Sequence, residues 1–323
     1  MSFSFITGID IGHYSIKAVV LKPVKGTLTL SAYRELTVEQ SIFSDNHLLS
    51  YQEIVNKLKE LRKSLPLFSH KVALSLPDNA VITKQVHIDK GLSPQERDYA
   101  IIEAFSHQSP LELDELSLDY CQLNAEKESH PSHLIQVYAT KKELVENRQR
   151  ICRKAGLRPV LFEVHAHSLV RLWQAASQRT QRDHWLLIDV GHTHCIMVMD
   201  LVEPLPLTKI LPIGTATGAE FFEQFIERIE RHLPLIGAMS AVNLAGIWLT
   251  GGGANKQGLA DSLSHRLNLA CELLDPLSLF SADHEPAETL PMSSALTVPG
   301  YCFAAAVGLA LLGRDWQEKN HAC

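Results

Sequence analysis

Two short acidic segments, Ile9-Asp10-Ile11-Gly12 and Ile188-Asp189-Val190-Gly191, carry the clearest chemical signal in this chain. In each, the aspartate ends one apolar run, and a second apolar run follows the glycine. This order indicates two β-strands joined by a tight hairpin, where glycine adopts backbone angles that other residues disfavour. Backbone amides exposed at such a turn can donate hydrogen bonds to phosphate oxygens. We therefore expect one phosphate-binding loop at each hairpin.

The two aspartates cannot bind phosphate directly, because like charges repel. Carboxylate oxygens are instead suited to Mg²⁺, which keeps several of its waters when it binds proteins. We predict that Asp10 and Asp189 hold Mg²⁺ through water. The other loop residues are expected to supply amides or hydroxyls to phosphate: Gly12, His13, Tyr14, Ser15, Gly191, His192 and Thr193.

A third segment, Gly251-Gly252-Gly253, follows the apolar run Ile247 to Leu249 and Thr250. Without side chains, this backbone can approach a flat base or a sugar closely. A single D-x-G hairpin is usually an ordinary β-turn. Two such hairpins followed by a triple-glycine loop instead favour a nucleotide held between two similar halves.

The composition suits a globular protein of two domains or one bilobed unit, with 323 residues, 46% hydrophobic residues and a net charge of −6. No basic block indicates a nucleic-acid partner. The basic stretch from Arg148 to Lys154 has helical spacing and is interpreted as a solvated helix face. The pairs His165/His167 and His192/His194 lack an acidic or thiol neighbour at ligand spacing, so a direct metal site is not favoured.

Six scattered cysteines without a C-x-x-C pair indicate reduced thiols in the cytosol. The start of the chain lacks the features of a signal peptide. The longest apolar stretch, Val298 to Leu312, is shorter than the roughly 20 residues that a bilayer helix needs. We expect a buried helix there, and a cytoplasmic chain without direct membrane insertion.

The elements expected around these motifs form two similar halves. Strands are predicted over 5–9, 16–21, 28–33 and 71–76, with a helix over 51–65. A different block follows, with strands over 81–88, 116–123 and 134–139 and helices over 94–107 and 141–155. A strand over 159–164 and a helix over 165–177 precede the second half, which restarts at Trp185. The predicted domains are a first lobe (1–79 and 157–182), an inserted subdomain (80–156), a second lobe (183–300) and a closing helix (301–323).

With these motifs in this order, the sequence resembles the actin-like ATPase superfamily and, within it, the PilM family of type IV pilus assembly. The matching motifs include G-I-D-I-G-x-x-S-I-K at 8–17, S-L-P-D-N-A-V-I-T-K at 75–84, A-G-L-R-P at 155–159, I-D-V-G-H-T at 188–193 and T-G-G-G-A at 250–254. The resemblance implies an α/β fold: two actin-like lobes with ribonuclease-H-like cores, plus a small α/β subdomain inserted in the first lobe.

The resemblance also implies ATP and Mg²⁺ as ligands, with Asp10 and Asp189 in the two phosphate loops and Gly251-Gly252-Gly253 in the adenosine loop. Further residues whose positions match the family are Lys17 in the first hairpin, Glu220 and Gln224 near the ribose and base, and Glu163 as a catalytic residue that positions water or metal. The bulky residues after each glycine, such as His13 and His192, depart from the small residues usual in the family. This departure argues against rapid hydrolysis of ATP. At most a slow ATPase is expected.

The partner implied is the N-terminal cytoplasmic tail of a PilN-like bitopic inner-membrane protein, docked near residues 81–88. The chain would then be cytoplasmic and peripheral to the inner membrane. The resemblance leaves open further machine components, a homo-oligomer, and which pilus or secretion machine is served. Two alternatives remain. One is a small-molecule phosphotransferase of the sugar-kinase type, for which Glu163 is the one candidate base found. The other is an FtsA-like cell-division protein, which calls for a C-terminal amphipathic membrane helix after a linker, whereas the stretch from Gly313 to Cys323 is short and polar.

Overall fold

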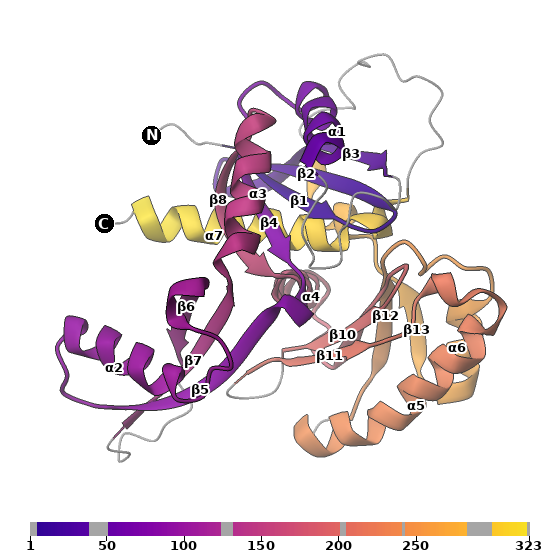
Figure 1. The fold of residues 1–323 in the computed structure, drawn as a ribbon. Coiled ribbons are helices and arrows are strands. Elements are labelled where there is room, and N and C mark those ends of the chain that lie inside the picture. Colours follow the sequence, from indigo (N-terminus) through magenta and orange to yellow (C-terminus); the bar gives the residue numbers. More distant parts are fainter. Residues whose placement is uncertain are drawn as a thin grey trace.

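The computed structural model describes residues 5–38, 51–123, 132–200, 205–240, 243–282 and 299–321. Residues 283–298 and Cys323, among others, lie outside these ranges. The described strands form three sheets (Figure 1). Two are mixed and resemble each other, whereas the third is small and antiparallel.

The first sheet has the strand order β14-β3-β2-β1-β4-β8. Strands β1 to β3 form the predicted meander, and β1 pairs in parallel with β4 on its other side. The strands are β1 Ile6–Ile11, β2 Ser15–Val24, β3 Thr27–Thr37, β4 Lys71–Leu76, β8 Arg158–Val164 and β14 Ser281–Ala282. Helices α1 (Tyr51–Ser64) and α3 (Lys142–Lys154) cover one face, where their apolar sides form one core with β1, β2 and β4.

The second sheet repeats this plan in the order β11-β10-β9-β12-β13. Its central strand β9 is antiparallel to β10 and parallel to β12, as β1 is to β2 and β4. The strands are β9 Trp185–Val190, β10 Cys195–Met199, β11 Leu207–Leu211, β12 Gly246–Thr250 and β13 Ala270–Leu273. Helices α5 (Phe221–Ser240) and α6 (Leu259–Leu267) accompany this sheet, and α5 continues past Pro234.

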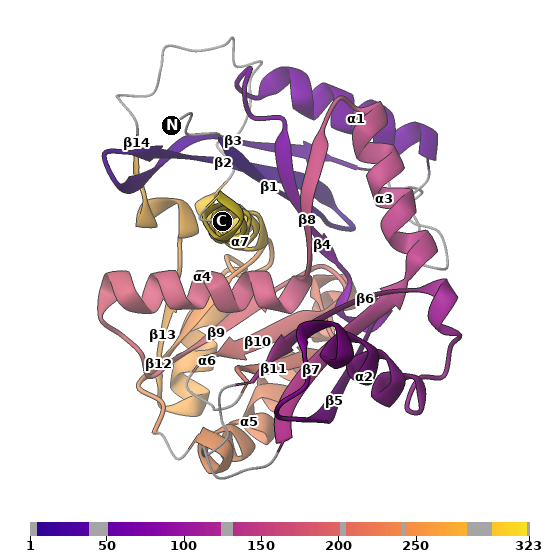
Figure 2. The ribbon, with the colours of Figure 1, turned by 90° about the vertical axis from the view of Figure 1, so that its left-hand side faces the viewer.

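Two helices, α4 (His165–Thr180) and α7 (Ala304–His321), lie between the two mixed sheets (Figure 2). Their apolar side chains share one core with the second sheet. Helix α7 lies directly on β1, where a Cβ at Gly8 would overlap the carbonyl oxygen of Ala306. A Cβ at Gly308 would likewise overlap the carbonyl oxygen of Ser168 on α4. Glycine at both points therefore permits the close approach that joins the lobes.

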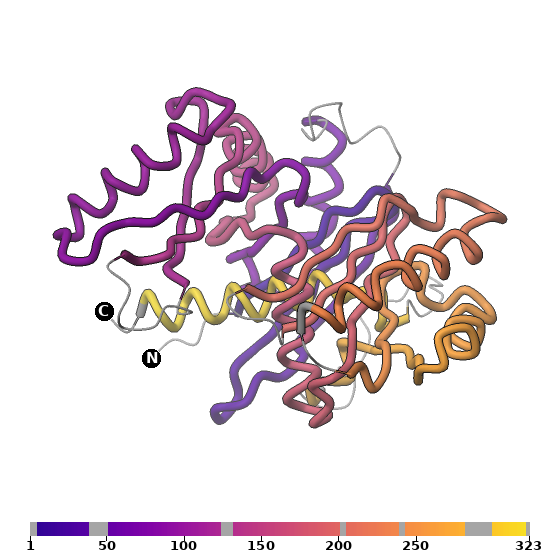
Figure 3. The backbone as a smooth tube through the Cα atoms, turned by 90° about the horizontal axis from the view of Figure 1, so that it is seen from below, coloured from indigo at the N-terminus to yellow at the C-terminus, as the bar shows by residue number. Residues whose placement is uncertain are grey.

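The third sheet has the order β5-β7-β6, so β5 (Val81–Asp89) and β6 (Leu116–Gln122) are edges around β7 (Ser132–Lys141). Helix α2 (Pro94–Ser106) begins at the predicted Ser93–Glu96 capping box and packs on this sheet. This unit stands to one side of the mixed sheets (Figure 3). Helix α3 belongs to the predicted segment 80–156 but packs on the first sheet, and β14 from the predicted range 183–300 pairs with β3. The residue bounds of the predicted domains stay predictions.

Among the described helices, none combines the length and the apolarity that crossing a membrane requires.

Candidate functional site

The two acidic hairpins have the same backbone arrangement. Ile11 pairs with Ile16 in the first, and the amide of Gly12 donates to the carbonyl of Ser15 at 3.0 Å. Val190 pairs with Cys195 in the second, and the amide of Gly191 donates to the carbonyl of His194 at 3.1 Å. Each glycine therefore closes a turn with two residues at its tip.

The tips of both hairpins line one cleft of about 860 Å³ between the lobes. The rings of Tyr14 and His192 lie 6.3 Å apart between their centroids, so bulky tip residues of the two hairpins approach each other. The cleft brings together most of the residues predicted from the sequence: Asp10, Gly12, His13, Tyr14, Lys17, Asp189, Gly191, His192, Thr193, Gly251, Gly252 and Gly253.

Asp10 lies among polar and charged neighbours on the first sheet. Lys17 is its cross-strand partner, and the Lys17 Nζ lies 3.8 Å from a carboxylate oxygen of Glu35. Nδ1 of His165, the first residue of α4, lies 3.8 Å from Oδ1 of Asp10. The hydroxyl of Ser15 donates to Glu35 at 2.5 Å. Ser15 is fully buried and does not line the cleft, so its predicted role toward phosphate has no support here.

Asp189 has a different pair of neighbours: Ile196, which is fully buried, is its cross-strand partner on β10, and Thr250 lies beside it on β12. Burial raises the pKa of Asp189 to about 6, and Asp10 raises it further, while His165 and Lys17 oppose the rise. A cation near this carboxylate would relieve the cost of its negative charge. Two carboxylates facing one cleft fit a hydrated Mg²⁺, which needs few protein ligands. The described residues contain no group of three or more histidine, cysteine or acidic side chains suited to hold a metal directly.

The glycine loop packs against the second hairpin. The amide of Gly253 donates to the carbonyl of Val190 at 2.9 Å. Gly251 has a φ of +89°, and a Cβ there would lie 2.7 Å from Oδ1 of Asp189. An added Cβ at Gly252 meets no atom within 4 Å. This open backbone at the cleft fits the close approach expected of a base or sugar.

Three other predicted residues do not line the cleft: Glu163, Glu220 and Gln224. Glu163 is the last residue but one of β8, and its Oε1 lies 2.9 Å from Nδ1 of His167. The ring of His167 in turn packs edge-on against Tyr138 of β7, at 5.1 Å. The side chain of Gln224 donates to Glu220 at 2.7 Å, and this pair is exposed.

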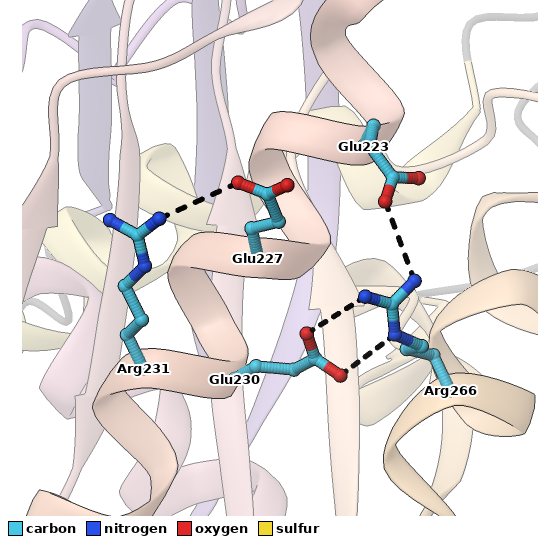
Figure 4. A network of polar contacts seen from close by, with 5 residues as sticks. All are labelled: Glu223, Glu227, Glu230, Arg231 and Arg266. Carbon is cyan, nitrogen blue, oxygen red and sulfur yellow. Dashed lines mark hydrogen bonds and ion pairs between the residues drawn. The ribbon is translucent and has the colours of Figure 1, made fainter.

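Helix α5, which follows Glu220, is held to α6 by charged side chains (Figure 4). Arg266 of α6 donates to Glu230 through two nitrogens, at 2.9 and 3.2 Å, and to Glu223 at 3.4 Å. These ion pairs are exposed, so each contributes little stability by itself. Their fork geometry nevertheless fixes α5 relative to α6, the helix that begins shortly after the glycine loop.

Sequence reasoning missed several residues that line the cleft, among them Asp78, Arg148, His165 and His194. Oδ1 of Asp78 accepts a hydrogen bond from the amide of Ala166 at 2.9 Å, which holds the start of α4 at the cleft. Asp78 lies in the motif S-L-P-D-N at 75–79, so the sequence did contain a signal for this one residue. Burial lowers the pKa of His194, and the nearby His165 lowers it further. Asp78 and Asp10 oppose that shift.

The family model described as the type IV pilus assembly protein PilM matches residues 8–203. The chain belongs to the PilM family of type IV pilus assembly proteins. A solved PilM–PilN type IV pilus biogenesis complex contains a chain that is 20% identical, with a TM-score of 0.75 and coverage of 95% of this chain and 98% of that one. The predicted actin-like fold is thereby confirmed: two ribonuclease-H-like mixed sheets with a small inserted antiparallel sheet.

A more distant likeness is the cytoplasmic domain of EpsL, an inner-membrane component of the type II secretion system of Vibrio cholerae. It is 10% identical, with a TM-score of 0.46 over 97% of this chain and 95% of that one. The ethanolamine utilization protein EutJ from Carboxydothermus hydrogenoformans is 13% identical, with a TM-score of 0.47 over 96% and 90%. Family membership therefore rests on the PilM family model.

Proposed function

We propose that this PilM-family protein binds Mg²⁺ and ATP between its two lobes and, in that form, docks a PilN-like membrane protein. One observation carries the nucleotide part. Two aspartate hairpins of equal geometry and a glycine loop, far apart in the sequence, line the same cleft of about 860 Å³.

Each part of the cleft has a separate task in this proposal. The amides at the tips of the hairpins donate to the phosphate oxygens, and Lys17 adds positive charge. Asp10 and Asp189 hold waters of the Mg²⁺ ion, which offsets the negative charge of the nucleotide. The base and sugar lie on the backbone of Gly252. Because such a ligand contacts both lobes, it favours the state in which the lobes are closed.

Calorimetry with ATP and ADP in the presence of Mg²⁺ tests this part. The wild-type protein is expected to bind ATP, and Asp10→Ala combined with Asp189→Ala is expected to abolish binding. Glu227→Ala with Arg231→Ala is a matched control, because this exposed pair on α5 lies off the cleft lining and has no predicted role toward the nucleotide. Failure of the wild type to bind either nucleotide would contradict the proposal. Equal binding by the aspartate double variant would contradict the role of the hairpins.

The partner proposed is the N-terminal cytoplasmic tail of a PilN-like protein of the inner membrane. Support comes from family membership and from the related PilM chain, which was solved in a complex with PilN. The inserted sheet offers β5 as an edge strand, where an extended peptide can add backbone hydrogen bonds. Such a partner would keep the protein at the cytoplasmic side of the inner membrane.

A synthetic tail peptide and anisotropy measurements test the docking site. Thr83→Glu with Gln85→Glu places two negative charges on the exposed face of β5. This variant is expected to weaken peptide binding about tenfold, a loss of about 1.4 kcal/mol. Gln122→Glu, on the opposite edge strand β6, is the control and is expected to bind like the wild type. Equal weakening on both edges, or no weakening by the β5 variant, would contradict this site without affecting the nucleotide proposal.

A further inference from the structure

The loop between α1 and β4 exposes two large apolar side chains to solvent. Leu67 is 81% exposed and Phe68 is 71% exposed, and they are adjacent in the sequence. Leu67 is the most exposed large apolar residue among the described parts of the chain. Neither side chain contributes to a hydrophobic core, so the fold gains little from their apolar character.

This loop is held in one shape by hydrogen bonds. The guanidinium of Arg62 donates to the carbonyls of Pro66 and Leu67, at 3.3 and 2.7 Å. The hydroxyl and the amide of Ser69 both donate to the carbonyl of Pro66, at 2.6 and 3.1 Å. Leu65, just before the loop, is buried in the core of the first lobe. The two apolar side chains therefore project from an anchored loop.

Exposed cations lie on the elements next to this loop. Lys59 and Lys63 come from α1, Arg153 and Lys154 come from the last turn of α3, and Arg158 begins β8. The amide of Arg158 donates to the carbonyl of His70 at 2.7 Å, which places β8 beside the loop. Figures 1 and 2 show α1 and the C-terminal end of α3 together at the top of the molecule. The whole chain carries a net charge of −6, so this concentration of positive charge is local.

Basic residues at the ends of α1 and α3 also compensate the negative ends of those helix dipoles. That effect explains Lys63, Arg153 and Lys154, but it gives no reason for Leu67 and Phe68 to be apolar. An apolar tip with exposed cations on the neighbouring elements is the pattern of a segment that enters the interface of an anionic bilayer. The tip protrudes, and a fluid surface can close around a protrusion without a preformed pocket. A second copy of the same face would bring like charges together.

We propose that the Leu67–Phe68 loop and the cations on the neighbouring elements form a contact site for anionic phospholipid at the cytoplasmic membrane surface. The two apolar side chains enter the boundary between headgroups and acyl chains, while the cations contact the phosphates. The contact neither spans the membrane nor involves the cleft. It is thus independent of nucleotide binding and of the proposed PilN-like partner, and would orient the first lobe toward the membrane.

Co-sedimentation of the full chain with vesicles tests the proposal. Wild-type protein is expected to bind vesicles of phosphatidylglycerol and phosphatidylethanolamine at low salt, and not vesicles of phosphatidylcholine alone. Leu67→Ser with Phe68→Ser is expected to weaken binding by about tenfold or more. Lys63→Glu with Arg153→Glu and Lys154→Glu is expected to abolish it and to remove its salt dependence.

The matched control is Tyr99→Ser with Leu235→Ser, which removes two exposed apolar side chains far from the loop, on α2 and α5. This control should bind vesicles like the wild type. Because the substituted apolar side chains are exposed, urea unfolding should show equal stability for the serine loop variant, its control and the wild type. The charge-reversal variant places negative charge at two helix C-termini and is expected to be somewhat less stable but still folded. Two results would overturn the proposal: no binding of the wild type to anionic vesicles, or equal vesicle binding by the serine loop variant.

Discussion

In the first hairpin the residue opposite the aspartate is a lysine, whereas in the second it is an isoleucine. The two backbones have the same pairing and the same closing hydrogen bond. Asp10 therefore has Lys17 directly opposite it and His165 at 3.8 Å, whereas Asp189 has an apolar residue opposite it. Burial raises the pKa of Asp189 to about 6, and His165 and Lys17 oppose this rise only in part. The difference shows that one backbone plan can place a cation directly opposite the carboxylate on one side of a cleft and an apolar side chain opposite it on the other.

The largest expected effect compares the two turn glycines. A Cβ at Gly191 would overlap the carbonyl oxygen of His194, whereas a Cβ at Gly12 would lie 3.2 Å from that of Ser15. Gly191→Ala is therefore expected to lower the free energy of unfolding by about 3 kcal/mol, and Gly12→Ala by about 1 kcal/mol or less. Urea denaturation of both variants measures this. Equal losses would mean that the two turns are equivalent in packing as well as in pairing.

The second prediction concerns charge and pH. A pKa raised from 3.8 to about 6 corresponds to at most about 3 kcal/mol of opposition to folding while Asp189 is ionised. Asp189→Asn is therefore expected to stabilise the ligand-free protein above pH 6. Between about pH 6 and pH 4 the folded wild type binds a proton that the unfolded chain does not yet bind, so the advantage of the variant should shrink and vanish.

Thermal or urea unfolding of the two proteins across this pH range gives the difference directly. Asp10→Asn is the matched substitution in the first hairpin. If the stability advantage of Asp189→Asn over the wild type instead grows as the pH falls, Asp189 does not have the raised pKa on which the contrast between the hairpins depends. Both variants are expected to lose affinity for Mg²⁺ and ATP.

A smaller effect is expected when the first hairpin is made to resemble the second. Lys17→Ile copies Ile196 and leaves Glu35 without its ion-pair partner. We expect a loss of about 1 kcal/mol in stability, and ATP binding that is weaker by about fivefold. Calorimetry and urea unfolding check both numbers. Ile196→Val, a conservative change at the equivalent place, should leave ATP binding unchanged.

The smallest expected effect is at the hairpin tips. Tyr14 is 62% exposed, and its ring contacts that of His192 at 6.3 Å between centroids. Tyr14→Ala should change the free energy of unfolding by about 0.5 kcal/mol or less. If the bulky tips narrow the entrance, it should also speed nucleotide association in stopped-flow measurements. An unchanged rate would show that the tip ring does not control access.

The hairpins and most expected strands and helices could be predicted from the sequence because their signals are local. D-x-G between apolar runs specifies a turn wherever it occurs, and the end of the strand Lys71–Leu76 was marked by the Pro77-Asp78-Asn79 that follows. The two-residue strand β14 has no such pattern, since it depends wholly on pairing with β3. The packing of α3 on the first sheet likewise depends on partners distant in the chain.

The positions of the site residues also depend on contacts that local sequence patterns do not show. Glu163 was predicted at the cleft, yet His165, two residues later, lines it. The choice between them depends on where β8 ends and α4 begins, and the hydrogen bond from Ala166 to Asp78 helps to set that point across a long stretch of sequence. Gln224 lies on α5 and Glu220 directly before it, and the direction of their side chains depends on how α5 packs against α6. Such orientation is not encoded in residue spacing.

The placement of α7 has a consequence for synthesis of the chain. Residues 304–321 cover β1, one of the first strands to be made, at the glycine contact with Ala306. While the ribosome is still translating the second lobe, the first sheet has no cover on that face, and its apolar residues are open to solvent or to chaperones. A nascent chain arrested before residue 299 is expected to be cut rapidly by protease in the first lobe, and extension through residue 321 should protect it. Folding of the first lobe is therefore complete only after α7 has been synthesised and has packed on β1.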